Sequence, residues 1–303
     1  MCPLWMVPVA LACGNTFVLK PSEKDPSVSM IAADLLKQAG LPDGVFNVIH
    51  GDKNAVDSLL THPDVEAVSF VGSTSVAKHV YQSATAHGKR VQALGGAKNH
   101  LIVVPDAEKK MTVDGIISSS MGSAGQRCMA ASVMVGVEEV DAIIDSIVES
   151  SAQLKLGEDM GAVISKAARE RIIRMIDEAK EQGARIVLDG RNPQSPEGYD
   201  GGYWLGPTII DHASPEMACA QVEIFGPVLT IVRADSLKEA MKIENSSPYG
   251  NAASIFTTSG AVSRYVSENA SAGMVGINVG VPVPRDPFSF GGWNQSKFGH
   301  GDI

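Results

Sequence analysis

The sequence predicts an α/β protein with two domains, each built around a mainly parallel sheet. Its 303 residues suffice for about two domains at a typical size of roughly 150 residues each. Hydrophobic residues make up 44% of the chain and charged residues 19%, proportions that are typical of a globular protein with a buried core. Short apolar runs alternate with amphipathic stretches, and this alternation is typical of parallel strands joined by helical crossovers.

The first part of the chain shows this alternation clearly. We expect strands at the short apolar runs 16–19, 45–49, 67–71 and 90–94. We expect helices in the amphipathic stretches 27–38, 54–60 and 75–86, with Gly40 and Gly88 placed to end two of them. In such sheets ligands bind beyond the carboxyl ends of the strands, so the loops there are the places where chemistry is expected.

The rest of the chain continues the alternation with a different spacing, which predicts a second α/β domain. Strands are expected at 101–104, 132–135, 185–188, 227–233 and 253–257. Helices are expected at 111–121, 140–153, 167–182 and 236–245. Segment 189–202 is polar and rich in turn-forming residues, which indicates a surface loop or hairpin rather than a linker.

Charge and cysteine content limit the possible partners. The net charge is -9 and the 25 Lys and Arg residues are scattered, so the basic patch of a protein that binds nucleic acid or an anionic membrane is missing. A small molecule is therefore the expected partner. Cys2, Cys13, Cys128 and Cys219 are widely spaced, without a CxxC pair or a zinc-type cluster, so we predict no metal site and expect thiols in a reducing compartment.

The apolar opening from Met1 to Gly14 has neither the charge pattern of a signal peptide nor the length of a membrane span. No Lys or Arg precedes Lys20, so the charged region of a signal peptide is absent. The run is also shorter than the roughly 20 residues that a spanning helix needs. We therefore expect a core element of a folded domain, and because chain termini normally lie at polar ends, we expect further residues upstream.

Cys128 is the candidate nucleophile. It ends a glycine-containing loop, directly after Arg127, and an apolar segment follows it. A lone cysteine is more often a small buried hydrophobic residue. A glycine loop, an adjacent cation and the positive end of a helix would, however, lower the pKa of the thiol and make the thiolate available. We therefore expect Cys128 in such a loop, near a helix N-terminus.

This loop carries a family resemblance. Gly125-Gln126-Arg127-Cys128 resembles the active-site cysteine signature of the aldehyde dehydrogenase superfamily, and four further stretches resemble that family's landmarks in the same order: 14–23, 70–74, 223–227 and 288–299. The resemblance covers nearly the whole chain. It implies an incomplete, parallel-sheet NAD-binding domain at 1–97 and a second, catalytic α/β domain at 98–303, whose final residues close back toward the first.

The resemblance also implies how NAD is held. Lys20 and Glu23 would bind the adenosine ribose, Gly72 and Ser73 the pyrophosphate, and Glu223 and Phe225 the nicotinamide ribose and ring. A Lys and a Glu suit two hydroxyls that need donors and an acceptor, and a helix N-terminus after a parallel strand favours an anion. Simpler explanations stay open: Ser73 as an ordinary helix cap, Lys20 as a solvated strand end and Glu223 as a surface acid.

One departure from the family pattern concerns the release of the acyl group. Most hydrolytic members carry a Glu in a Glu-Leu-Gly-Gly-Lys stretch that activates water, whereas residues 91–98 here contain no acid. The Gly-Ala-Lys-Asn-His stretch at 96–100, together with Arg127, resembles the coenzyme-A-acylating methylmalonate-semialdehyde dehydrogenases. In that group the Arg helps to hold the substrate carboxylate. Coenzyme A is then a co-substrate, and methylmalonate or malonate semialdehyde gives an acyl-coenzyme A with loss of carbon dioxide.

A second departure is the length of the chain. The family's oxyanion-stabilising Asn, in an Asn-Phe-Pro element, has no match, nor does the C-terminal strand that docks on a partner subunit. Because one oxyanion donor contributes about 100- to 1000-fold in rate, we expect a nearly inactive fragment of a homo-oligomer from the cytoplasm, or from the mitochondrial matrix of a eukaryote. A hydrolytic semialdehyde dehydrogenase and an inactive binding subunit remain alternatives.

Overall fold

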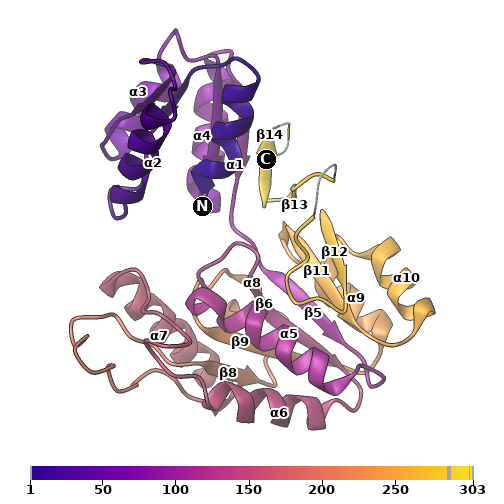
Figure 1. Cartoon of the computed structure of the whole chain (residues 1–303). Coiled ribbons are helices and arrows are strands. Elements are labelled where there is room, and N and C mark those ends of the chain that lie inside the picture. Colours follow the sequence, from indigo (N-terminus) through magenta and orange to yellow (C-terminus); the bar gives the residue numbers. More distant parts are fainter. Residues whose placement is uncertain (1, 285–287, 300, 302–303) are drawn as a thin grey trace. The chain divides into compact units, whose positions relative to one another are not determined.

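The computed structural model describes residues 2–284, 288–299 and 301, and the chain divides into two compact units (Figure 1). The first unit runs to Gly95 and takes in the segment from Lys297, and the second runs from Gly96 to Ser296. The division lies close to the boundary expected between residues 97 and 98. The functions expected for the two units stay predictions.

The first unit contains two small sheets and the helices between their strands. β1 (Phe17–Leu19) pairs in parallel with β2 (Phe46–Val48). β3 (Ala67–Val71) pairs in parallel with β4 (Arg90–Leu94), and β14 (Lys297–Gly299) adds to β4 in the antiparallel direction. Helices α2 (Ser27–Gln38), α3 (Lys53–Thr61) and α4 (Thr74–Ala86) lie where the sequence predicts them. Leu60, Val80 and Ala93 belong to the core that joins α3, α4 and β4.

The opening helix α1 (Cys2–Ala12) corrects the prediction of a core element. Val7 is its one buried residue among positions 2–12, while Leu4 is 63% and Val9 64% exposed. An apolar sequence can form a helix because the backbone hydrogen bonds are internal, but burial requires neighbours on every side of it. In the described residues α1 lies beside β1, and all but one of its residues are half-buried or exposed. No helix in this described part is long and apolar enough to cross a membrane.

The second unit is built on a seven-stranded sheet with the order β12-β11-β5-β6-β9-β8-β7. Its strands are β5 (Asn99–Val103), β6 (Ala131–Val137), β7 (Arg185–Leu188), β8 (Thr208–Asp211), β9 (Val228–Ala234), β11 (Ala252–Phe256) and β12 (Met274–Ile277). Neighbouring strands are parallel except for β7 and β8. A separate antiparallel pair joins β10 (Tyr249–Gly250) to β13 (Trp293–Asn294).

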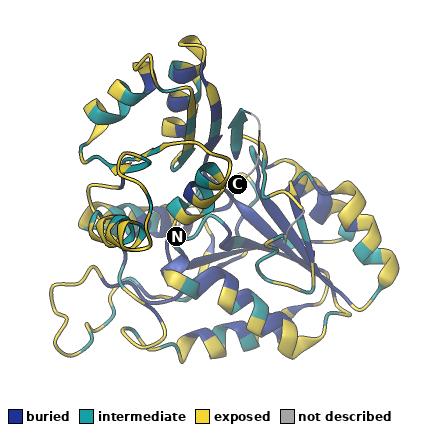
Figure 2. Ribbon diagram, turned by 45° about the horizontal axis from the view of Figure 1, so that its top comes forward, coloured by how far each residue is buried: buried dark blue, intermediate teal, exposed yellow. Residues whose placement is uncertain are grey.

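Helices cover both faces of this sheet. Successive residues of a strand point to opposite faces, so Leu101 and Ile102 of β5 belong to different hydrophobic clusters. The cluster of Leu101 packs under α5 (Lys109–Met121) and α6 (Asp141–Ala152). The cluster of Ile102 packs under α7 (Lys166–Glu181), α9 (Leu237–Asn245) and α10 (Gly260–Asn269). Figure 2 shows the sheet buried and the outer sides of the helices exposed, which confirms the α/β prediction.

Several short elements of the second unit were missed by the sequence analysis. They are β8, β10, β12, β13, the four-residue helix α8 (Ala218–Gln221) and the longer α10. The four strands and α8 have two to four residues, which is too few positions for a periodic pattern, whereas the ten-residue α10 was simply not recognised. Segment 189–202 contains neither helix nor strand, which confirms the predicted loop.

Glu244 is a buried acid at the end of α9. Its side chain is 4% exposed, and its Oε2 accepts a hydrogen bond of 3.0 Å from the backbone N–H of Ser271. Burial raises the pKa of this carboxyl group, and the hydrogen bond from Ser271 opposes the rise. The contact ties α9 to the segment that leads into β12.

Candidate active site

Cys128 lies in a tight turn between α5 and β6. The turn begins with the short 3-10 helix η1 (Gly122–Gly125), in which Ser123 and Ala124 adopt left-handed φ angles of 54° and 52°. A Cβ on Gly125 would overlap the carbonyl oxygen of Gly226, and Gly125 itself has a φ of 65°. Left-handed conformations cost non-glycine residues roughly 1–2 kcal/mol each. The turn is therefore held by close packing rather than by local preference.

Two buried amides hold the main chain at Cys128. Nδ2 of Asn99 donates to the Cys128 carbonyl at 2.8 Å and to the Ala130 carbonyl at 3.1 Å. Oδ1 of Asn99 accepts from the backbone N–H of Ala252 at 3.0 Å. Asn251 adds a second donor to the Cys128 carbonyl at 3.2 Å. Asn99 thus ties the end of the turn to β5 and β11 and fixes the position of the candidate nucleophile.

The surroundings of the Cys128 side chain are apolar. It is half-buried and packs against a small cluster whose buried members are Met129, Ala252 and Met274, with Val281 and Phe290 at its edge. None of the four cysteines, all of which lie in the described residues, forms a disulfide. Cys128 is therefore a thiol in a partly dry environment with one side open.

The structure corrects the expected relation of Cys128 to a helix. The turn follows the C-terminus of α5 and leads into a strand, so the nearby helix end is the negative one. The positive charge of Arg127 interacts favourably with this helix end, because its Nη2 donates to the carbonyls of Ser118 and Ser119, the latter at 3.1 Å. The sequence predicted a helix N-terminus near Cys128 and a strand at 132–135. The strand is confirmed as part of the buried β6, whereas the helix N-terminus is wrong because the helix beside the turn, α5, ends there.

Arg127 has a second donor, Nε, that is buried and is not used in a hydrogen bond within the described residues. An unsatisfied buried donor is costly, about 1–3 kcal/mol, and calls for an explanation. Arg127 is therefore anchored through Nη2, while its buried Nε is a donor that the described residues leave unpaired.

The loop after α8 presents Glu223 and Phe225. Oε1 of Glu223 accepts a 3.0 Å hydrogen bond from the Ala97 N–H, and burial raises the pKa of this carboxyl group. Arg171 donates to the carbonyls of Glu223 at 3.3 Å and Ile224 at 2.6 Å. Phe225 has a positive φ of 52° and is 38% exposed. Glu223 is thus held by the fold and is not a free surface acid.

The other cofactor candidates lie in the first unit. At the end of β1, Nζ of Lys20 donates to the Gly51 carbonyl after β2 at 2.9 Å and lies 3.5 Å from Oε2 of Glu23. Backbone hydrogen bonding and Lys20 lower the pKa of Glu23. The Lys and Glu therefore stand together at the carboxyl ends of two parallel strands, the place expected for a ligand.

Gly72 and Ser73 form the turn between β3 and α4. A Cβ on Gly72 would overlap the ring of Phe70, which explains the glycine. Ser73 is the N-cap residue of α4, but its side chain accepts no hydrogen bond from the helix. The simple explanation of Ser73 as a helix cap therefore lacks its usual hydrogen bond. The N-terminus of α4 is the positive end of that helix, which favours an anion nearby.

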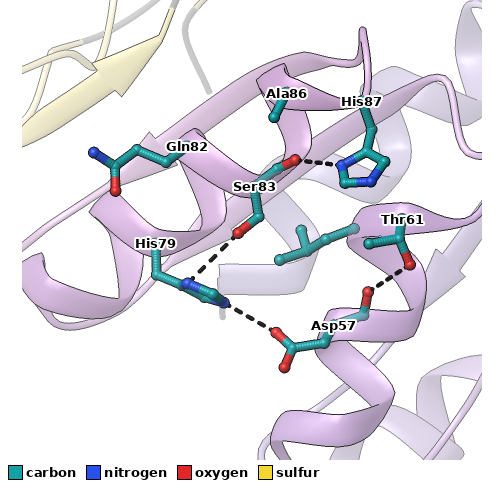
Figure 3. Close-up of a pocket in the computed structure, with 8 residues that line it drawn as sticks. Asp57, Thr61, His79, Gln82, Ser83, Ala86 and His87 are labelled. Carbon is teal, nitrogen blue, oxygen red and sulfur yellow. Dashed lines mark hydrogen bonds and ion pairs between the residues drawn. The ribbon is translucent and has the colours of Figure 1, made fainter.

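The hollow shown in Figure 3 is not made of the candidate site residues. It has a volume of about 420 Å³ and lies between α3 and α4 of the first unit. In its wall His79 contacts Asp57 at 2.9 Å and Ser83 at 3.5 Å. Although Ser83, His79 and Asp57 resemble a hydrolytic triad, His79 is exposed, Ser83 is half-buried, and the two are neighbours one turn apart on α4. We assign this hollow no function.

Three residues of the second unit escaped the sequence analysis as functional candidates: Lys98, Asn99 and Asn251. Lys98 and Asn99 belong to the Gly-Ala-Lys-Asn-His stretch that carried the family resemblance, so a signal for them was present. No sequence signal marked Asn251, because its contact with Cys128 spans 123 positions.

Comparison with known proteins identifies the family. The model of the aldehyde dehydrogenase family matches residues 1–303, and the chain belongs to that family. Among curated relatives, malonate-semialdehyde dehydrogenase of Pseudomonas aeruginosa is 49% identical over 307 residues, which cover 99% of this chain and 62% of that protein. The acylating, mitochondrial methylmalonate-semialdehyde dehydrogenase of Arabidopsis thaliana is 48% identical over 309 residues, which cover 100% of this chain and 50% of that protein.

Solved structures agree with this assignment. Methylmalonate-semialdehyde dehydrogenase from Oceanimonas doudoroffii superposes with a TM-score of 0.96 at 50% identity, covering 99% of this chain and 63% of that one. A Sinorhizobium meliloti structure complexed with NAD gives a TM-score of 0.97 at 47% identity, covering 100% of this chain and 63% of that one. This chain therefore spans less than two thirds of the length of these relatives.

Proposed function

We propose that this chain provides the nucleophile and much of the cofactor site of an NAD-dependent, coenzyme-A-acylating dehydrogenase of methylmalonate or malonate semialdehyde. The observation that carries the proposal is the loop of Cys128, held by Asn99 and Asn251 after a Gly-Gln-Arg sequence. Relatives near 48% identity bear the names of these enzymes. The homo-oligomer and the cytoplasmic or mitochondrial location belong to the same proposal.

In this proposal the Cys128 thiolate attacks the aldehyde carbon and forms a thiohemiacetal. Bound NAD would supply the hydride acceptor needed to oxidise this adduct, which would leave the acyl group as a thioester on Cys128. Asn99 and Asn251 fix the backbone of the nucleophile, so that Sγ stays at the reacting carbon. Arg127, which directly precedes Cys128, is proposed to hold the substrate carboxylate.

The residues proposed to bind NAD fit that role in both units. In the first unit, Lys20 and Glu23 supply a donor and an acceptor for the adenosine ribose. The turn of Gly72 and Ser73 would bring the N-terminus of α4 to the pyrophosphate, although the N–H of Gly72 itself donates to the Leu94 carbonyl at 3.1 Å. In the second unit, Glu223 supplies an acceptor for the nicotinamide ribose, and the exposed ring of Phe225 supplies an apolar surface for the nicotinamide.

Coenzyme A is proposed as the acceptor because the acid that would activate water is missing from residues 91–98. A positioned base contributes about 100- to 10,000-fold to attack by water, whereas a thiol is intrinsically a strong nucleophile and needs less help. The family resemblance allows an acid at either of two positions, Ala93 or Leu94, and both are buried, at 0% and 6% exposure. An acid restored at either position would therefore have to be accommodated in a buried place.

The proposal is tested by the mass of Cys128 itself. The chain is mixed with NAD and malonate semialdehyde without coenzyme A, then digested, and the peptide that contains Cys128 is examined for an acyl adduct. We expect a stable adduct that coenzyme A removes as acyl-coenzyme A, and no adduct in Cys128→Ser. An adduct that water discharges as fast as coenzyme A does would favour the hydrolytic alternative. NAD binding without any adduct would favour a binding subunit.

A further inference from the structure

Lys98 has a buried amine in the second unit, and the proposed reaction gives this amine no role. It directly precedes β5, its side chain is 2% exposed, and its Nζ has no hydrogen-bond partner within the described residues. Transferring an ammonium group from water to such a site is costly unless another charge compensates for it. The position therefore requires a reason beyond packing.

Groups from three other segments face Lys98 or its neighbours. Cys219 of α8 and Glu223 of the following loop interact electrostatically with Lys98, as does His100, which lies two residues further along β5. Arg171 of α7 acts on Glu223 from another side. Among these groups Glu223 is the acid that can balance an ammonium, since the buried Cys219 thiol has a pKa raised by burial.

The backbone next to Lys98 also reaches Glu223. The N–H of Ala97 donates to Glu223 Oε1 at 3.0 Å, so two consecutive residues supply the carboxyl group with a hydrogen bond and a nearby positive charge. Arg171 is engaged with the main-chain carbonyls of Glu223 and Ile224. Residues 97 and 98 therefore interact with the side-chain carboxyl group of Glu223, whereas the hydrogen bonds of Arg171 go to the main chain.

Burial opposes the charge on both side chains. It lowers the pKa of Lys98 to about 7, against the attraction of Cys219 and Glu223. It raises the pKa of Glu223, against the hydrogen bond of Ala97 and the attraction of Lys98 and Arg171. Each charged form is thus favoured by the other, so loss of the lysine charge would push Glu223 toward its neutral acid.

We propose that Lys98 is a positioning residue that keeps Glu223 ionised, so that Glu223 can accept hydrogen bonds from a pair of ligand hydroxyl groups. A carboxylate is an acceptor at both oxygens, whereas a protonated carboxyl group carries a donor in place of one acceptor. That these hydroxyls belong to the nicotinamide ribose rests on the proposed function. The charge relation between the two side chains does not depend on it.

The direct test is the titration of Glu223 in the 303-residue chain. The side-chain carboxyl carbons of glutamate are labelled with 13C, and the signal of Glu223 is identified by its absence in Glu223→Gln. In Lys98→Met we expect Glu223 to titrate at least about one pH unit higher than in the unchanged chain, as loss of a nearby opposite charge implies. In Lys98→Arg, which keeps the charge, we expect no rise.

Cys219→Ala is the matched control, because it removes the other partner of Lys98 and leaves the lysine charge in place. We expect it to leave the titration of Glu223 unchanged. Lys98→Gln is a second variant without the lysine charge, in case Lys98→Met does not fold. The titration is read in whichever of the two keeps an unchanged circular dichroism spectrum. An unchanged titration of Glu223 in such a variant would overturn the inference.

NAD binding measured by calorimetry from pH 6 to 9 separates this inference from the proposed function. We expect NAD affinity in Lys98→Met to be lowered at pH 6 and to recover as the pH rises and Glu223 ionises, a recovery that a merely structural defect would not show. If Glu223→Gln binds NAD as tightly as the unchanged chain, the ribose role of Glu223 is wrong. The titration result still decides the role of Lys98.

Discussion

Asn99→Ala should destabilise the second unit because it removes a buried amide that makes three hydrogen bonds. The bonds join Asn99 to the carbonyls of Cys128 and Ala130 and to the N–H of Ala252, and Asn99 is 2% exposed. At a net contribution of about 1 kcal/mol for each bond, the free energy of unfolding should fall by about 3 kcal/mol. Cys128 keeps the longer bond from Asn251.

The assay is urea unfolding followed by the fluorescence of Trp204, which is buried in the second unit. Trp5→Phe and Trp293→Phe provide the background in which this one tryptophan reports. Asn269→Ala is the matched control: its Nδ2 also donates to a carbonyl, that of Tyr265 at 2.8 Å, but on an exposed helix end.

The control should change the unfolding free energy by less than about 0.5 kcal/mol, as surface substitutions usually do. A loss in Asn99→Ala no larger than that of the control would refute the argument that this amide holds the turn of the nucleophile.

Three further predictions concern stability and substrate choice. Burial raises the pKa of Glu244 above its ordinary 4.5, so the cost of ionising it in the folded state appears as the pH rises through and above 4.5. In urea unfolding, Glu244→Gln should therefore increase the free energy of unfolding at pH 8 but not at pH 4. Equal increases at the two pH values would contradict this. Gly125→Ala should distort the turn, because its Cβ would overlap the Gly226 carbonyl, whereas Gly161→Ala has open space; thermal unfolding should separate the two. In the completed, full-length enzyme, Arg127→Leu should raise the KM for malonate semialdehyde far more than that for propanal, which has no carboxylate to hold. Equal increases would contradict the proposed role.

The sequence predicted the fold where its pattern was long enough. The helices α2, α4, α6, α7 and α9 and the strands β3 to β6, β7, β9 and β11 lie at or near their expected positions, because amphipathic periodicity and apolar runs are local properties. The apolar opening was misjudged for the opposite reason. Its exposure depends on which elements pack against α1, and hydropathy does not contain that information.

The same division runs through the candidate site. The glycines around the turn, the neighbouring Arg127 and Cys128, and the missing acid between 91 and 98 are local features, and the sequence by itself determined them and the family to which they belong. Only the tertiary structure decided that Arg127 caps the negative end of α5 and that Asn99 holds the main chain at Cys128. It also decided that Lys98 is buried close to Glu223. These relations join residues up to 125 positions apart, as for Lys98 and Glu223. Contacts between such distant residues are set by how strands pair and layers pack, which no local pattern records.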